Sequence, residues 1–334
     1  MSNPSARAAA VRIATRFIDA MPSTDPISTV ALIGAGTMST DIAAIFVARG
    51  VDVHVVSRPG KNLETVRERI LRSCEQIAGT KGPRGAIHVS SDLASLPWQG
   101  VGLVIESVNE DLALKQKIFA DLERHASSST PLTSNSSSFP ISRIGEGLKT
   151  QSRMLGLHFF MPAHLVPLVE VVCSEKTDVA LAARIGQFME TLDCMHVMVK
   201  RDIPGFLANR LQHALMREAW SLIDRGIASP DDVDKAVRFG FGMRYLAAGP
   251  VLQKEHSGLD VNFAASSSVF PDLCNDDRPP PVLAEKVKRN ELGMKTGQGF
   301  WPWPAERIAA ERARYARMLG TALAALKADS PRDG

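Results

Sequence analysis

The chain has 334 residues, of which 45% are hydrophobic and 22% charged, an ordinary balance for a globular protein of about two domains. This composition excludes intrinsic disorder and collagen-like repeats, and no apolar run approaches the roughly 18 to 20 residues of a membrane helix. The formal net charge is +3, and no basic cluster is interleaved with aromatic residues. The sequence therefore predicts a soluble protein without a nucleic-acid surface and without a membrane partner.

Two features of the sequence bear on the cellular compartment. The four cysteines, at positions 74, 173, 194 and 274, fit neither a metal site nor a disulfide-dense scaffold, which favours a reducing cytoplasm. Residues 1–28 form an N-terminal extension with arginines among alanines, a composition that resembles an organelle transit peptide. Asp19 and Asp25 interrupt that acid-poor pattern, so an additional surface helix is the favoured interpretation.

In chain order, the first elements alternate between strand and helix. Val30 to Gly34 is a short apolar run that ends in glycine, a helical spacing continues to Gly50, and residues 51–56 form a second buried strand. This unit of about 30 residues is typical of one βαβ crossover. Further strands are expected at 86–90, 101–107, 131–134 and 154–160, and further helices at 63–77 and 112–123. The alternation predicts an α/β fold with a doubly wound, Rossmann-type parallel sheet over residues 29–201.

Beyond Arg201 the pattern becomes helical. Asp202-Ile203-Pro204-Gly205 punctuates the chain at this point, and Pro204 suits the first turn of a helix. Helices are expected at 206–225, at 230–239, from 258 onward, at 281–290 and at 304–327. The sequence therefore predicts an all-helical C-terminal domain over residues 202–330.

A glycine-rich turn lies between the first strand and the first helix. Residues 34–39, GAGTMS, nearly complete the pattern G-x-G-x-x-G. Gly34 permits the tight turn, and Gly36 lets the backbone approach a pyrophosphate held at the helix N-terminus. Ser39 replaces the third glycine, whose position sets how closely the helix packs on the strand. With the second strand at the right distance, the turn predicts dinucleotide binding.

The end of the second strand indicates which dinucleotide binds. An acidic residue at this place would hydrogen-bond the adenosine ribose of NAD. The chain instead has Ser57, which makes room for a 2′-phosphate, and Arg58, which supplies the matching charge, with Lys61 close behind. The predicted cofactor is therefore NAD(P), with a preference for NADP. The alternative is a solvated arginine at a strand end in an NAD enzyme.

Two further segments carry candidate catalytic side chains. The serine-rich loop at residues 134–138 follows an expected strand, and its hydroxyls are suited to hold a substrate oxygen. His158 lies in an expected strand, and Glu170 lies twelve residues on in an apolar run, where an ionised carboxylate needs a partner. If the intervening turn brings them together, the acid fixes one imidazole tautomer and favours the protonated ring, as expected for a general base. The alternative is a core histidine bonded to the backbone, with Glu170 paired elsewhere.

Several motifs in a fixed order make the chain similar to the 3-hydroxyacyl-CoA dehydrogenase family. They run from Gly34 to about Trp303 and read GAGTM, NEDLALK, SNSSSFPIS, GLHFFMP, PLVEVV, RDIPGFLANRLQ and ELGMKTGQGF. The resemblance implies an NAD(P)-dependent dehydrogenase that interconverts a 3-hydroxy and a 3-oxo group, and a homodimer formed through the helical domain. It also implies the catalytic residues His158, Glu170, Ser137 and Asn209. Either neighbouring serine, Ser136 or Ser138, could take the place of Ser137.

The resemblance further implies how these residues act. Nε2 of His158 takes the hydroxyl proton of the substrate while the carbon-bound hydrogen leaves as hydride to the nicotinamide. Glu170 stabilises the imidazolium, and Ser137 and Asn209 donate hydrogen bonds to the substrate oxygens. The expected cofactor contacts are Gly34, Gly36, Thr37, Met38, Ser57, Arg58, Glu110, Lys115, Asn135 and Lys295.

Departures from the family pattern bear on the substrate. Met161 stands where the family's HFFNP motif has asparagine, and the insertion after the second strand is shorter than the one that helps fatty-acid enzymes to grip CoA. The segment around Arg244 resembles a loop of L-gulonate and L-carnitine dehydrogenases, where an arginine suits a carboxylate or, alternatively, a dimer interface. Met161 and Arg244 are therefore expected substrate contacts, and a small hydroxy acid is the favoured substrate. The alternatives are an acyl-CoA, a ring-bearing alcohol or aldehyde acid, and a crystallin-like protein that binds the dinucleotide without turnover.

Overall fold

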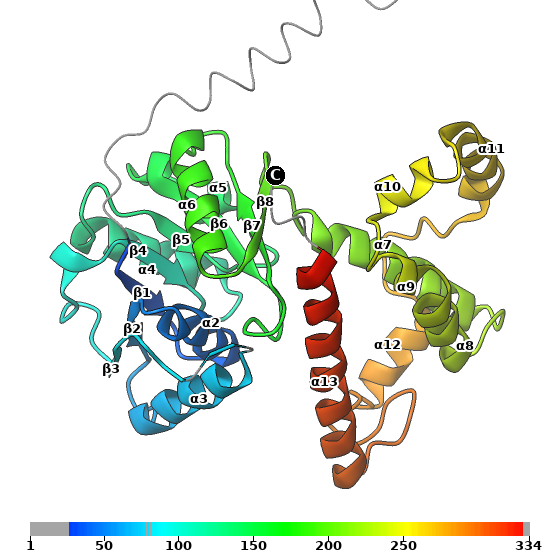
Figure 1. The fold of residues 1–334 in the computed structure, drawn as a ribbon, viewed down its shortest axis with the longest axis horizontal. Coiled ribbons are helices and arrows are strands. Elements are labelled where there is room, and N and C mark those ends of the chain that lie inside the picture. The colour runs from blue at the N-terminus through cyan, green and yellow to red at the C-terminus, as the bar shows by residue number, and fades with distance from the viewer. Residues whose placement is uncertain (1–26, 78, 81, 330–334) are drawn as a thin grey trace, which may run out of the picture.

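The computed structural model describes residues 27–77, 79–80 and 82–329. The N-terminal extension expected over residues 1–28 lies outside the described residues except for its last two positions. Within the described part, no helix combines the length and the apolar character needed to cross a bilayer. The described chain folds into a sheet-based half followed by a helical half (Figure 1).

One eight-stranded sheet organises the first half. Its strands are β1 (Thr29–Ile33), β2 (Asp52–Val56), β3 (Ile87–Ser90), β4 (Leu103–Glu106), β5 (Leu132–Ser134), β6 (Met154–Phe159), β7 (Leu168–Val172) and β8 (Met195–Val199). They lie in the order β3-β2-β1-β4-β5-β6-β7-β8. The chain order reverses between β1 and β4, and open sheets of this class bind ligands outside the carboxyl ends of their strands at such a switch point.

Helices cover both faces of the sheet, as a doubly wound fold requires. On one face, α2 (Thr37–Ala48), α3 (Leu63–Gln76) and α6 (Val179–Thr191) share a core with the strands. On the other face, α4 (Leu112–His125) and the short α5 (Ile141–Ile144) share a second core. The central strands β1, β4 and β5 are buried on both faces, which explains the largely apolar sequences of β1 and β4.

The pairing of β6 with β7 is antiparallel in an otherwise parallel-paired sheet. The chain reverses through residues 160–167, and β7 pairs antiparallel with β6 in a register that places His158 opposite Glu170. A parallel neighbour would need a crossover of a dozen or more residues, so a connection this short requires the reversal. β8 then runs parallel to β7, with α6 as the crossover between them.

The second half is all-helical, as the sequence predicts. Its elements are α7 (Ala208–Asp224), α8 (Pro230–Lys235), a π-helical segment (Ala236–Phe241), α9 (Gly242–Arg244), α10 (Pro250–Glu255), α11 (Leu259–Val269), α12 (Pro281–Lys288) and α13 (Ala305–Asp329). Among the described residues of these helices, Ala219 is the one buried apolar side chain. Val251, Phe263 and Phe270 are 67–76% exposed. A single chain therefore does not close a hydrophobic core in this half.

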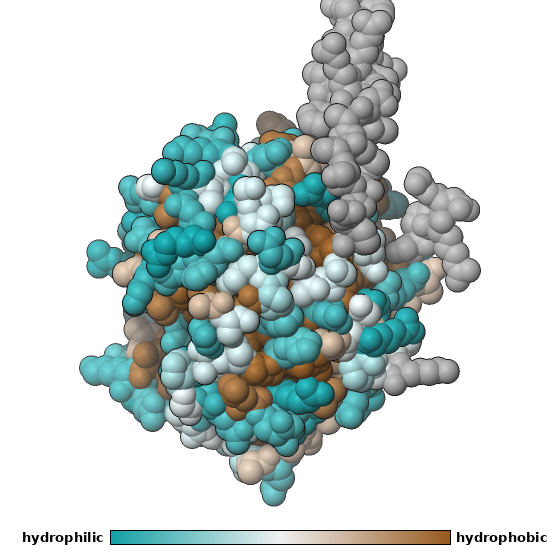
Figure 2. All heavy atoms as spheres, turned by 90° about the vertical axis from the view of Figure 1, so that its left-hand side faces the viewer, coloured by the Kyte–Doolittle hydropathy of each residue, from teal (hydrophilic) through white to brown (hydrophobic). Residues whose placement is uncertain are grey.

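The outer face of the sheet-based half differs from the helical half. Figure 2 shows mainly hydrophilic side chains on that face, with hydrophobic ones set in the recesses between them.

Candidate active site

The antiparallel pairing of β6 with β7 brings the two candidate catalytic side chains together. His158 and Glu170 lie directly opposite each other in the register, and Nδ1 of the imidazole is 2.7 Å from Oε2 of the carboxylate. Both residues are buried, with Glu170 fully so. Because a carboxylate only accepts, the contact assigns the proton to Nδ1 and leaves Nε2 as the free, basic nitrogen.

Glu170 is held as an anion by groups from two elements. Its second oxygen, Oε1, accepts hydrogen bonds from the backbone N–H groups of Leu207 at 3.0 Å and Ala208 at 2.7 Å, at the beginning of α7. Burial by itself would raise the pKa of this carboxyl, but the hydrogen bonds from His158 and from these two amides outweigh it and lower the pKa. The helical half therefore helps to fix the charge of a residue on the sheet.

Aromatic rings fix the orientation of the imidazole. The ring of Phe160 meets the ring of His158 edge-on at a centroid distance of 4.6 Å, and that of Phe206 does so at 5.6 Å. Phe206 is buried and precedes the amides that bind Glu170. The imidazole thus has a fixed tautomer and a fixed plane.

The serine loop after β5 is organised by Glu110. The carboxylate of Glu110 accepts from Oγ of Ser136 at 2.9 Å and from the backbone N–H of Ser137 at 2.7 Å. Oγ of Ser136, which is buried, also accepts from the N–H of Phe139 at 3.0 Å. Ser136 is therefore occupied within the loop. Oγ of the more accessible Ser137 also donates to Oε1 of Glu110, at a longer distance of 3.3 Å, and Ser138 is exposed. Ser137 and Ser138 are therefore the two serines of the loop that a substrate can reach.

A buried ion pair lies next to Glu110. Nζ of Lys115 lies 2.7 Å from Oε1 of Glu106 and 3.7 Å from Oε2 of Glu110. Lys115 and Glu106 are fully buried, and Oγ of Ser134 donates to the other oxygen of Glu106 at 2.6 Å. Sequence reasoning did not single out Glu106, although an acid at the end of an apolar strand was the available signal. The structure places Lys115 beneath the serine loop, where it holds Glu110 in position.

Asn135 ties the carboxyl ends of two strands together. Its Oδ1 accepts from the N–H of Phe159 at 2.8 Å, and its Nδ2 donates to Oγ of Ser107 at 3.3 Å. The serine loop and the end of β6 are therefore held at one edge of the sheet.

The phosphate-binding turn has the geometry that the glycine pattern predicts. Gly34 has φ = +115°, and a Cβ at this position would lie 2.5 Å from the carbonyl oxygen of Ser107. Gly36 caps α2, and no heavy atom would lie within 4 Å of a Cβ there, so the space in front of its backbone is open. Ser39 is fully buried and packs against the carbonyl of Ser107. These residues fit the pyrophosphate of a nicotinamide dinucleotide.

Three cationic side chains surround this turn. The ammonium of Lys61 donates to the carbonyl oxygen of Ala35, and Nη2 of Arg69 donates to Oγ1 of Thr37 at 3.0 Å. Burial, followed by the charges of Arg69 and Arg58, lowers the pKa of Lys61. Among the described residues, no carboxylate lies within ion-pair distance of these three cations. The turn therefore carries positive charge that has no carboxylate counter-ion in the described part of the chain.

The remaining predicted residues lie in different surroundings. Met38 packs against the core under α2, and Ser57 is buried at the end of β2. Met161 is 64% exposed, and Asn209 directly follows the amide of Ala208 that binds Glu170. Arg244 is the last residue of α9, and Lys295 lies in the turn before α13. Within the described chain, neither side chain makes a hydrogen bond or ion pair with the sheet-based half. One chain brings together the His–Glu pair, the serine loop and the start of α7, but not these two cations.

Comparison with protein families identifies both halves of the chain. Residues 29–203 match the NAD-binding domain of 3-hydroxyacyl-CoA dehydrogenase, and residues 205–303 match the C-terminal domain of the same enzyme. The chain is 36% identical over 290 residues to 3-hydroxybutyryl-CoA dehydrogenase of Mycobacterium tuberculosis, covering 84% of this chain and 99% of that protein.

A relative with a different substrate is also similar along most of its length. The chain is 31% identical over 299 residues to 5-formyl-3-hydroxy-2-methylpyridine 4-carboxylate 5-dehydrogenase of Mesorhizobium japonicum, covering 88% of this chain and 96% of that one. The crystal structure of a dehydrogenase of this name, described as an NAD⁺-dependent dismutase, superimposes with a TM-score of 0.85 at 30% identity, covering 90% of this chain and 99% of that chain. The fold, the site and these relatives together show that the chain belongs to the 3-hydroxyacyl-CoA dehydrogenase family of dehydrogenases acting on CH–OH groups.

Proposed function

We propose that this chain oxidises the hydroxyl-bearing carbon of a small hydroxy acid with NAD(P), and catalyses the reverse reduction. The observation that carries the proposal is the 2.7 Å contact of Nδ1 of His158 with Glu170, which leaves Nε2 free near the carboxyl edge of the sheet. The phosphate-binding turn lies at the same edge. The dinucleotide, when bound, supplies the acceptor for the hydride.

The residues of this chain handle the proton and the charge. Nε2 of His158 accepts the hydroxyl proton as the carbon–oxygen double bond forms, and the anionic Glu170 stabilises the imidazolium that results. Ser137, and Asn209 at the beginning of α7, donate hydrogen bonds to the substrate oxygens. In the reverse direction the imidazolium returns the same proton to the carbonyl oxygen.

Replacing His158 tests the proposed base. We expect His158→Ala to lower kcat by about 10²- to 10⁴-fold, because proton transfer by a positioned group contributes that much, while dinucleotide affinity stays nearly unchanged. Steady-state kinetics and titration of the dinucleotide measure the two effects. His88→Ala, which removes an exposed histidine of β3, is the matched control. Unchanged turnover in His158→Ala would refute the base, and no turnover by the wild type on any substrate would favour a crystallin-like role.

Two observations favour a small acid over an acyl-CoA. The apolar Met161 takes the place of the family's asparagine, and α3 is the one helix between β2 and β3 in the described chain, so no helical hairpin is present there to grip CoA. The high structural similarity to the pyridine-carboxylate dehydrogenase makes a ring-bearing acid the second candidate. A panel of free oxo acids, ring-bearing aldehyde acids and acetoacetyl-CoA distinguishes them, and faster reduction of the thioester would refute the preference for a free acid.

We also propose that the cofactor is NADP rather than NAD. Ser57 leaves space at the end of β2, and Arg58, Lys61 and Arg69 provide positive charge that has no carboxylate counter-ion among the described residues. A 2′-phosphate is the anion that distinguishes NADP from NAD at this place.

Binding of the adenosine half of the cofactor tests this preference directly. We expect Arg58→Ala to weaken 2′,5′-ADP by about tenfold or more and 5′-ADP by less than twofold, since only the first ligand carries the 2′-phosphate. Isothermal titration calorimetry measures both affinities without turnover. Arg72→Ala, on the same α3 as Arg69, is the control for a general loss of positive charge. Equal weakening of both ligands by Arg58→Ala would support NAD instead.

We further propose a homodimer formed through the helical half. Its support is the exposure of large apolar side chains on helices that bury almost none of them in one chain. We infer a domain boundary near residues 201–202, where the last strand gives way to helices. A reducing compartment such as the cytoplasm accords with the four free cysteines, three of them buried.

A further inference from the structure

The loop of residues 160–167 connects the two catalytic strands. It follows His158 on β6 and leads to Glu170 on β7, and its first side chain, Phe160, contacts the ring of His158. The N–H groups of Leu165 and Val166 both donate to the carbonyl oxygen of Pro162 at 3.0 Å. A shift of this loop would therefore change the contact between the ring of Phe160 and the imidazole of His158.

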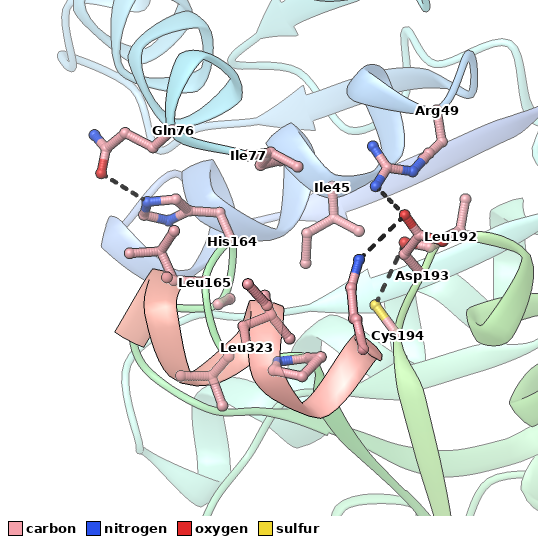
Figure 3. A pocket seen from close by; sticks show the side chains of 16 residues that line it. Ile45, Arg49, Gln76, Ile77, His164, Leu165, Leu192, Asp193, Cys194 and Leu323 are labelled. Carbon is pink, nitrogen blue, oxygen red and sulfur yellow. Dashed lines mark hydrogen bonds and ion pairs between the residues drawn. The ribbon is translucent and has the colours of Figure 1, made fainter. Parts of the chain in front are cut away.

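His164 connects this loop to the helices beneath it. Its Nδ1 lies 3.2 Å from Oδ1 of Asp41 on α2, and its Nε2 lies 3.1 Å from Oε1 of Gln76 at the end of α3. Figure 3 shows the ring of His164 reaching to Gln76 across the edge of a cavity. The side chains of His164 and Asp41 are each only 7% exposed.

Asp41 is a buried carboxylate with few other partners. Oγ of Ser73 donates to its Oδ1 at 2.8 Å, and His164 is the one group in the described chain within ion-pair distance of it. A buried carboxylate needs a donating partner, and for Asp41 the hydroxyl of Ser73 supplies a hydrogen bond while the imidazole of His164 packs beside it. Asp41 lies four residues beyond Thr37, on the helix whose N-terminus carries the phosphate-binding turn. His164 is thus hydrogen-bonded to α3 through Gln76, and its ring lies against the carboxylate of Asp41 on the dinucleotide-binding helix.

The C-terminal end of α13 covers the other side of the loop. Leu323 and Lys327 line a cavity of about 190 Å³ together with His164 and Leu165, and Lys327 lies 3.5 Å from Asp193 (Figure 3). The helix α13 lies beyond residues 205–303, which match the family's C-terminal domain. The loop is therefore enclosed between α2, α3 and α13.

We propose that His164 is a positioning residue, which, held by Asp41 and Gln76, fixes the loop of residues 160–167 so that Phe160 keeps the ring of His158 in its catalytic orientation. The inference rests on the proposed function of His158 as the base. Its physical basis is that a misplacement of about 1 Å at a reacting group costs up to about 10²-fold in rate.

Turnover by variants of His164 tests the inference. We expect His164→Ala to lower kcat about 10- to 100-fold, while the dissociation constant of the dinucleotide changes less than twofold. His164→Asn retains a donor close to the position of Nδ1 and is expected to recover most of kcat. The matched control is His125→Ala at the end of α4, because His125 is exposed and α4 covers the face of the sheet opposite to α2 and α3. This control is expected to leave kcat within about twofold of the wild type.

Hydrogen exchange of the loop provides a readout that does not depend on turnover. We expect the peptide containing residues 160–167 to exchange faster in His164→Ala than in the wild type, and to exchange normally in His164→Asn and His125→Ala. Unchanged exchange in His164→Ala, or equal loss of kcat in His164→Ala and His164→Asn, would overturn the positioning role. An active wild type with an unaffected His164→Ala refutes this inference alone, whereas a wild type without any turnover refutes the proposed function as well.

Discussion

The charge of Glu170 controls the chemistry at the scale of single residues. Its carboxylate accepts from Nδ1 of His158 and from two backbone amides, so it both selects the tautomer and stabilises the cation formed during oxidation. An amide at this place has nearly the same shape but no charge, and it can present an N–H group to Nδ1. We therefore expect Glu170→Gln to lower kcat by about 10²- to 10⁴-fold, as steady-state kinetics would show. A loss smaller than about threefold would contradict this role.

The same carboxyl links stability to pH. Its folded-state pKa lies below that of an unfolded glutamate, which is about 4.3. Its stabilising contribution is therefore fully present above that unfolded value and is lost as the pH falls through the folded value. Urea denaturation at pH 7 and pH 3 is expected to show a smaller difference in unfolding free energy between the wild type and Glu170→Gln at the lower pH. An equal difference at both pH values would contradict this linkage.

At the scale of elements, the two glycines that begin α2 have separable roles. A methyl group on Gly34 would overlap the carbonyl of Ser107 and requires an unfavourable φ, whereas one on Gly36 meets only open space. We expect Gly34→Ala to reduce the free energy of unfolding by about 1–3 kcal/mol. Gly36→Ala is expected to leave stability within about 0.5 kcal/mol but to weaken the dinucleotide by tenfold or more. Denaturation curves measure the stability of the two variants, and titration measures their affinity for the dinucleotide. If both variants bind the dinucleotide as tightly as the wild type, the pyrophosphate binds elsewhere.

At the scale of the whole molecule, the helical half requires a partner surface. Phe263 and Val261 on α11 are 76% and 57% exposed, and Phe270 just beyond is 67% exposed. We expect light scattering to give about twice the monomer mass of 36.1 kDa, and Phe263→Glu to shift the protein towards the monomer, because a charge opposes burial of that face. The control is Lys117→Glu on α4 of the sheet-based half, which changes the charge without altering the apolar face of α11. A monomeric wild type would refute the dimer.

Local sequence patterns determined most of the elements and the chemical class of the site. Apolar runs and helical spacing predict β1 to β6 and most of the helices beyond Arg201 to within a few residues, because each signal lies within one segment. They do not predict β8, and in place of one helix over 230–239 the structure has α8 followed by a π-helical segment. The glycine pattern likewise predicts the phosphate-binding turn, since the turn needs a positive φ at Gly34 and open space at Gly36. The ordered motifs likewise indicate the family, because each motif lies within one continuous segment.

Only the tertiary structure decided which of these residues meet. The contact of Glu170 with the beginning of α7 and the approach of His164 to Asp41 join positions that are far apart in the chain. Glu106 was overlooked because a buried acid is stable only beside a partner such as Lys115. The sequence pattern alone does not show that the two side chains are close in space. The spacing of apolar residues determines which secondary structure a segment can form. Tertiary packing determines which charged side chains are buried next to each other.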